Sequence, residues 1–135
     1  MNEAHETASL LATVPGGREL LNWFSGTPNF GDAEIIALHL NRAEPSTLVI
    51  EVPGRSGAAI VTLVLWDWID VRICGFSHQN VIGGLTLRRA GERQLAPWEV
   101  GVGAIPGKVE IELKPIFGAN GVIRATLVSV GVQIS

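Results

Sequence analysis

Asp32 and Glu34, two carboxylates two residues apart, are the side chains whose type and spacing best suit chemistry. In an extended segment, residues two apart share a face, so the pair could bind a cation or exchange protons. The alternative is that they cap the segment, or accept hydrogen bonds from backbone amides where the chain passes from a helix into a strand. We expect this structural role and no metal site.

The histidines and the cysteine show no spacing typical of a metal or catalytic site. His5, His39 and His78 fall in no His-x-His or His-Glu-x-x-His spacing, and on a straight strand His39 would point away from the face of Glu34. Cys74 is the only cysteine, which excludes an intrachain disulfide and a cysteine-rich zinc site. We expect a buried thiol there, and neither a catalytic group nor a cofactor.

A short helix followed by many strands would position these side chains. Apolar residues at helical spacing predict a helix over Arg18–Phe24, and from residue 32 onward the hydrophobic period falls to two. Glu34–Leu40 is apolar on both faces, which indicates a strand covered on both sides. Lys108–Lys114 alternates strictly, which predicts one buried and one solvent-facing side. Further strands are expected at Thr47–Val52, Ala58–Trp66, Val71–Phe76 after a bulge at Asp67–Asp70, Leu85–Arg89, Trp98–Gly103 and Val122–Ile134.

This pattern predicts a mainly β fold, an antiparallel β-sandwich or partly open barrel of about seven or eight strands with one short N-terminal helix. Residues 1–14 show no clear period and are expected to be a flexible N-terminus. Residues 15–135 are expected to form a single β-rich domain.

Composition limits the partners. Of the 135 residues, 47% are hydrophobic and 17% are charged, and the net charge is −3. A nucleic-acid binder normally carries a basic stripe, so we expect no nucleic-acid partner. The longest apolar run, Ala58–Trp66, is far shorter than a membrane span, and the N-terminus lacks the features of a signal peptide. We therefore expect a cytoplasmic protein with no membrane partner.

The shortage of charge also predicts apolar surface that another protein covers. A cognate partner or a homodimer would satisfy this expectation. Trp66 and Trp68 are the candidate interface anchors, because partly exposed aromatic residues suit that role.

Two segments and the closing hairpin carry a resemblance. Residues 22–35 read NWFSGTPNFGDAEI, and residues 71–82 read VRICGFSHQNVI. Together they resemble the bacterial immunity protein fifty family, which is associated with polymorphic toxin systems. The resemblance implies family-motif positions, with a structural or binding role, at Phe30, Asp32, Ala33, Glu34, Gln79 and Asn80. Gly31 stands where family members typically have histidine, so no role of that histidine transfers to this chain.

The resemblance implies an immunity-type protein that neutralises a cognate bacterial toxin by stoichiometric occlusion. The acidic balance suits a basic toxin. The alternative is a small-ligand-binding or interaction module without catalysis, in which Trp66, Trp68 and Trp98 line a pocket and Arg72 or Gln79 orients the ligand. An enzyme is not expected, because the sequence shows no nucleophile–base spacing, metal signature or phosphate-binding loop.

Overall fold

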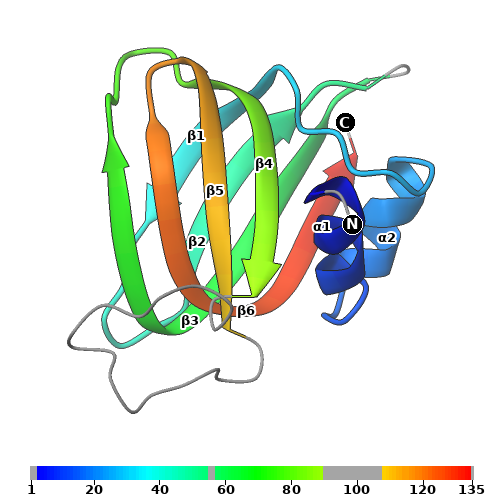
Figure 1. The fold of residues 1–135 in the computed structure, drawn as a ribbon, viewed down its shortest axis with the longest axis horizontal. Coiled ribbons are helices and arrows are strands. Elements are labelled where there is room, and N and C mark those ends of the chain that lie inside the picture. Colours follow the sequence, from blue (N-terminus) through cyan, green and yellow to red (C-terminus); the bar gives the residue numbers. More distant parts are fainter. Residues whose placement is uncertain (1–2, 55–56, 90–107, 135) are drawn as a thin grey trace.

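Six antiparallel strands close into a barrel in the computed structural model, which describes residues 3–54, 57–89 and 108–134 (Figure 1). Around the barrel the strands follow the order β1-β2-β3-β6-β5-β4. The mainly β, antiparallel fold is confirmed, and the barrel is closed rather than a sandwich or a partly open barrel. The strand expected at Trp98–Gly103 lies outside the described residues. The strands are β1 Ala33–His39, β2 Ser46–Val52, β3 Ala59–Cys74, β4 Val81–Arg89, β5 Lys108–Phe117 and β6 Asn120–Ile134.

The described strands number fewer than expected partly because the bulge at Asp67–Asp70 does not end its strand. Register passes from Trp66 opposite Thr126 to Asp70 opposite Arg124, four positions along β3 but only two along β6. Extra residues in one strand of a pair bend it and leave the ladder intact on either side. The two strands expected on the two sides of the bulge are therefore one strand, β3.

A second bulge, at Ile36, makes the expected coverage of β1 wrong. The register with β2 shifts there by one residue, and a one-residue shift moves the following side chains to the other face. Leu38 consequently packs against the core, while Ile36 is exposed. His39 pairs with an outward-facing residue of β2 and lies on the outer wall, the side of Glu34, contrary to the expected alternation.

Two helices pack against one side of the barrel. Helix α2, Gly17–Trp23, agrees with the predicted helix to within one residue at each end. Helix α1, Glu3–Leu11, occupies the segment that was expected to be flexible. Its Leu10 and Leu11 join the core cluster, and buried Thr7 accepts a hydrogen bond from the backbone N–H of Leu87 in β4 (3.0 Å). The hydroxyl thus satisfies a strand amide that no neighbouring strand reaches.

The inward-facing side chains of all six strands and both helices form a single buried cluster. Leu48, Ile50 and Val52 illustrate the pattern, because every second residue of β2 is fully buried while Glu51 between them is exposed. Side chains of the described residues therefore fill the inside of the barrel.

The barrel closes through a short seam between β1 and β4. Only Ala33 and Glu34 are in register there, opposite Ile82 and Val81. Two backbone hydrogen bonds extend the seam, from Asp32 N–H to the Ile82 carbonyl (2.9 Å) and from Ile35 N–H to the Asn80 carbonyl (2.8 Å). The two segments that carried the family resemblance are thus brought together at this seam.

Candidate functional site

The residues of the first motif, in the segment 22–35, have mainly a structural role at the seam. Phe30 and Ala33 are buried, and the Phe30 ring meets Phe24 edge-on at a centroid distance of 5.2 Å. Asp32 has φ +65° and is therefore not extended, so the two-residue alternation does not place it on one strand face with Glu34. The described residues contain no group of three His, Cys, Asp or Glu side chains that could hold a metal ion.

Asn80, from the second motif, joins the β3–β4 loop to the β5–β6 hairpin. Its Oδ1 accepts hydrogen bonds from the backbone N–H groups of Ser77 and Ala119, both at 3.0 Å, and its Nδ2 donates to the Ser77 carbonyl (2.9 Å). Ala119 is fully buried, so its amide has no access to water. Gln79 differs: it is exposed, and its backbone alone bonds to the Ser77 hydroxyl.

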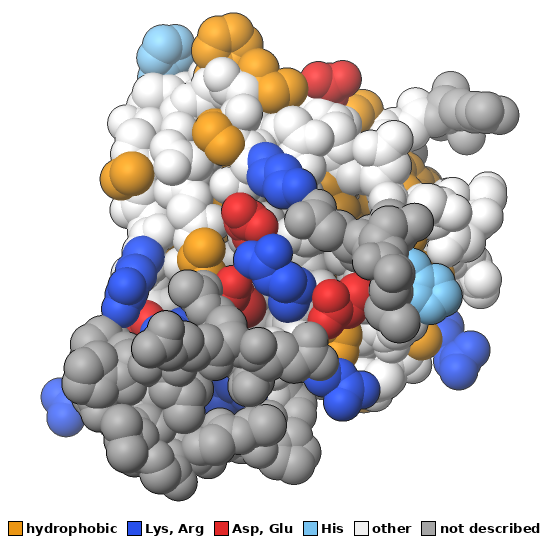
Figure 2. All heavy atoms as spheres, viewed as in Figure 1, with side chains coloured by type: hydrophobic (Ala, Val, Ile, Leu, Met, Phe, Trp, Pro, Cys, Tyr) orange, Lys and Arg blue, Asp and Glu red, His pale blue; other side chains and the backbone are white. Residues whose placement is uncertain are grey.

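Four exposed apolar residues lie in this joined pair of loops or on the strands next to it. We call them the apolar rim: Ile36, Phe76, Ile116 and Phe117, each about half exposed, with Phe117 the most exposed at 61%. Phe117 pairs with Val81 of β4, and Ile36 follows directly after the last seam residue. Figure 2 shows hydrophobic side chains gathered at this end of the molecule, near the β5–β6 hairpin and the β3–β4 loop.

The apolar rim was missed because it depends on bulges and turns. Strict alternation would bury one of two consecutive residues, but the register between β4 and β5 shifts at Ile116, and both Ile116 and Phe117 are exposed. The available signal was two adjacent large apolar residues just before a turn glycine. Cys74, expected to be buried, is exposed at the same end, and its thiol lies 3.8 Å from Asn120 Oδ1.

The expected anchors lie elsewhere. Trp66 is 40% exposed on β3, opposite Thr126 and eight residues before the end of the strand at the apolar rim. Trp68 is outside the residues whose side chains are described, and Trp98 is in a segment that is not described. Of the three tryptophans, only the Trp66 side chain is therefore placed by the structure.

A row of alternating charge crosses the outer wall. Arg88 of β4 is opposite Glu110 of β5, Glu110 is opposite Arg124 of β6, and Arg124 is opposite Asp70 of β3. Arg88 Nη2 bonds Glu110 Oε1 (2.8 Å) and approaches Glu112 Oε1 (3.1 Å), while Arg124 bonds Asp70. Figure 2 shows blue and red side chains following one another over this wall.

This charged row corrects the expectation of a solvent-facing side on β5. Glu110 is 1% exposed and Lys108 is 5% exposed, so only the later part of the strand is open to solvent on that face. The hydrogen bond from Arg88 to Glu110 is the main cause that raises the pKa of Arg88, against partial burial, which lowers it. The charged row is therefore tied together by ion pairs within the barrel wall.

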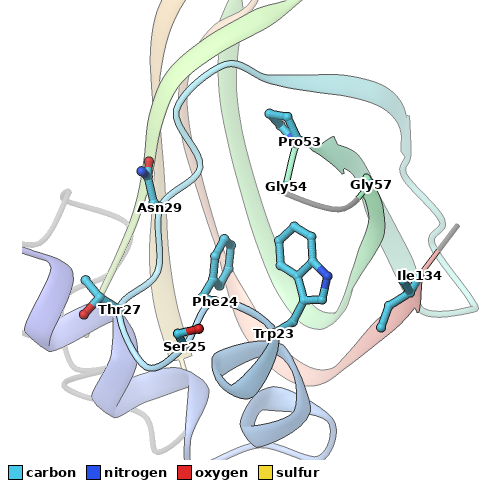
Figure 3. Close-up of a pocket in the computed structure, with 9 residues that line it drawn as sticks. All are labelled: Trp23, Phe24, Ser25, Thr27, Asn29, Pro53, Gly54, Gly57 and Ile134. Atoms are coloured by element: carbon cyan, nitrogen blue, oxygen red, sulfur yellow. The ribbon is translucent and has the colours of Figure 1, made fainter.

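A cavity of about 660 Å³ lies outside the barrel, between α2 and the end of β2 (Figure 3). Trp23 and Phe24 form one side, and their rings meet edge-on at 5.1 Å. The other described lining residues are Ser25, Thr27, Asn29, Pro53, Gly54, Gly57 and Ile134. None of these carries a charge or a nucleophile paired with a base, so they provide no catalytic chemistry.

The Trp23 ring depends on the glycine that faces it. A Cβ on Gly54 would stand 2.7 Å from Trp23 Cζ2 and 2.6 Å from the Gly57 carbonyl oxygen. We expect Gly54→Ala to displace the indole and to lower the free energy of unfolding by about 1–3 kcal/mol. Fluorine NMR of fluorotryptophan-labelled protein would detect the displacement as a shifted Trp23 signal.

Gly131→Ala is the matched control for this substitution. Its added Cβ would make only an ordinary contact, 3.8 Å from Thr62 Cβ, so the Trp23 signal should keep its position. An unchanged Trp23 signal in Gly54→Ala would show that the ring is not held by this contact.

Comparison with known proteins adds no assignment: no family model, curated protein or solved structure matches the chain. Within the described parts of the chain, neither helix is long and apolar enough to cross a membrane.

Proposed function

We propose that this chain is an immunity-type binding protein of the cytoplasm that neutralises a bacterial toxin by stoichiometric occlusion, and that the apolar rim is the surface it presents. The observation that carries the proposal is the exposure of Phe76 in the β3–β4 loop and of Phe117 at the end of β5, 57% and 61%, beside the segments that Asn80 joins. Exposed aromatic residues at a fixed position are typical anchors of protein interfaces.

The way the loops are held supports this choice of surface. Association costs free energy for every side chain and loop that must be ordered, and a prearranged surface lowers that cost. The hydrogen bonds of Asn80 order both loops before any partner arrives. The described residues offer no metal cluster, and the outer-wall charges near β5 are engaged in ion pairs. Of the described features, the apolar rim therefore supports a binding function best.

The small-ligand alternative has one observation in its favour, the cavity beside Trp23. Trp66 is not among its described lining residues, and the cavity is open to solvent. Thermal shift with neutral aromatic and sugar ligands would test it, since a bound ligand stabilises the folded state in proportion to its concentration.

The proposed function is tested by co-expression with the toxin-like protein encoded beside this gene. We expect the wild-type chain to restore growth, and Phe117→Asp to abolish protection while the protein remains folded, because a charge would replace an exposed anchor. Truncation of such an anchor commonly costs about 2 kcal/mol or more of binding free energy, which isothermal titration with the purified toxin would measure.

Val128→Asp provides the matched control, because Val128 is also exposed but lies eight positions along β6 from Asn120 at the apolar rim. It should protect as well as the wild type. Failure of the wild-type chain to protect, or equal protection by Phe117→Asp, would contradict the proposal. Sedimentation analysis of the purified chain decides the remaining alternative, in which a second copy covers the apolar rim.

A further inference from the structure

The apolar rim continues into two carboxylates along one row of the barrel wall. Glu51 of β2 is opposite Glu34 of β1, Glu34 is opposite Val81 of β4, and Val81 is opposite Phe117 of β5. Glu51, Glu34 and Val81 point outward, because each is followed along its strand by a buried interior residue. Phe117, opposite Val81, is 61% exposed. Directly opposite residues in a sheet have Cβ atoms about 5 Å apart, so acidic and apolar groups form one continuous strip.

The two carboxylates in this strip have no cationic partner among the described residues. Neither Glu34 nor Glu51 makes an ion pair or a side-chain hydrogen bond with any residue in the described parts of the chain, whereas Asp70, Glu110 and Glu112 each have an arginine. Like charges directly opposite in a sheet are destabilising. The two carboxylates therefore repel each other in the free protein, and a cation supplied by a partner would remove this repulsion.

We infer that the partner places an arginine side chain, with apolar neighbours, on this strip. A guanidinium presents five N–H donors in a planar fork and can bond two carboxylates at once, which suits the pair Glu34 and Glu51. Its aliphatic stem can pack on apolar surface while the charged end reaches the acids, and Val81 and Phe117 supply that surface. This inference rests on the proposed binding function of the apolar rim and names the chemistry of the partner surface.

The test selects phage-displayed 12-residue peptides on the immobilised wild-type chain. We expect the selected peptides to be enriched in arginine next to aromatic or large aliphatic residues. The double variant Glu34→Gln/Glu51→Gln should bind those peptides roughly tenfold more weakly or worse, because it lacks both carboxylates that pair with the arginine of the peptide. The pair Glu19→Gln/Glu44→Gln removes the same charge from exposed positions outside the strip and should bind the peptides as the wild type does.

Thermal unfolding separates a binding effect from a folding defect. Because the substitution relieves a like-charge contact, Glu34→Gln/Glu51→Gln should unfold at the same temperature as the wild type or higher. Peptides without arginine enrichment, or peptides that bind this variant as tightly as the wild type, would overturn the inference. The toxin is not used here, so failure of toxin protection would reject the proposed function without deciding the outcome of this selection.

Discussion

Replacing Glu110 with alanine is expected to lower the free energy of unfolding by about 3 kcal/mol, because it removes the buried carboxylate from an ion pair with Arg88. Glu110 stands between Arg88 and Arg124 in the charged row and is 1% exposed, while the Arg124 side chain is 9% exposed. Water cannot replace a carboxylate at that depth. Urea denaturation would show the loss as a lower midpoint with an unchanged slope.

Glu112→Ala is the control on the same strand and with the same arginine. Glu112 approaches Arg88 Nη2 at 3.1 Å, but its side chain is 33% exposed. A partly exposed pair is worth at most about 1 kcal/mol, so this variant should remain close to the wild type. Equal losses for the two variants would show that burial of Glu110 does not set its contribution.

Asn80→Ala is expected to cost about 2–4 kcal/mol of folding stability. The substitution removes the acceptor for two backbone N–H groups, and one of them, on fully buried Ala119, would be left without any partner. An unsatisfied buried donor costs about 1–3 kcal/mol by itself. Hydrogen exchange should show faster exchange of the Ala119 amide, and chemical denaturation would give the total loss.

Gln79→Ala tests whether the two neighbouring motif positions share this role. The Gln79 side chain is exposed, and the residue bonds to the Ser77 hydroxyl through its backbone alone, so stability should change by no more than about 0.5 kcal/mol. If Asn80→Ala proved as mild as Gln79→Ala, the junction between the two loops would have to depend on other contacts.

Regular alternation was sufficient to predict the regular strands. β2 has the expected limits to within one residue and the expected inward side chains, and the Asp67–Asp70 bulge falls where the pattern breaks. The errors arise where one strand gains a residue over its neighbour. No local property of Ile36 or Ile116 shows that a bulge falls there, because the register depends on a partner strand that is distant in sequence.

The candidate site was predicted only in part, and the physical reason is the same. The motif residues were identified, but they are brought together by the pairing of β1 with β4, and these strands are about 50 residues apart in sequence. Their mainly structural use at Phe30, Ala33 and Asn80 is visible only once that pairing exists. Glu34 differs, because its outward side chain contributes nothing to the seam and is available to a partner.

The hydrogen bond between Thr7 and Leu87 has a consequence for self-association. Beyond Ile82, none of the described strands pairs with β4 on the side of β1. A bare strand edge is a template on which another chain can add a strand and aggregate. Thr7 accepts from an amide on that edge, and α1 lies along β4 (Figure 1). Helix α1 thus covers this strand edge and disfavours edge-to-edge association. The protein can therefore expose the apolar rim without also exposing this edge of the sheet.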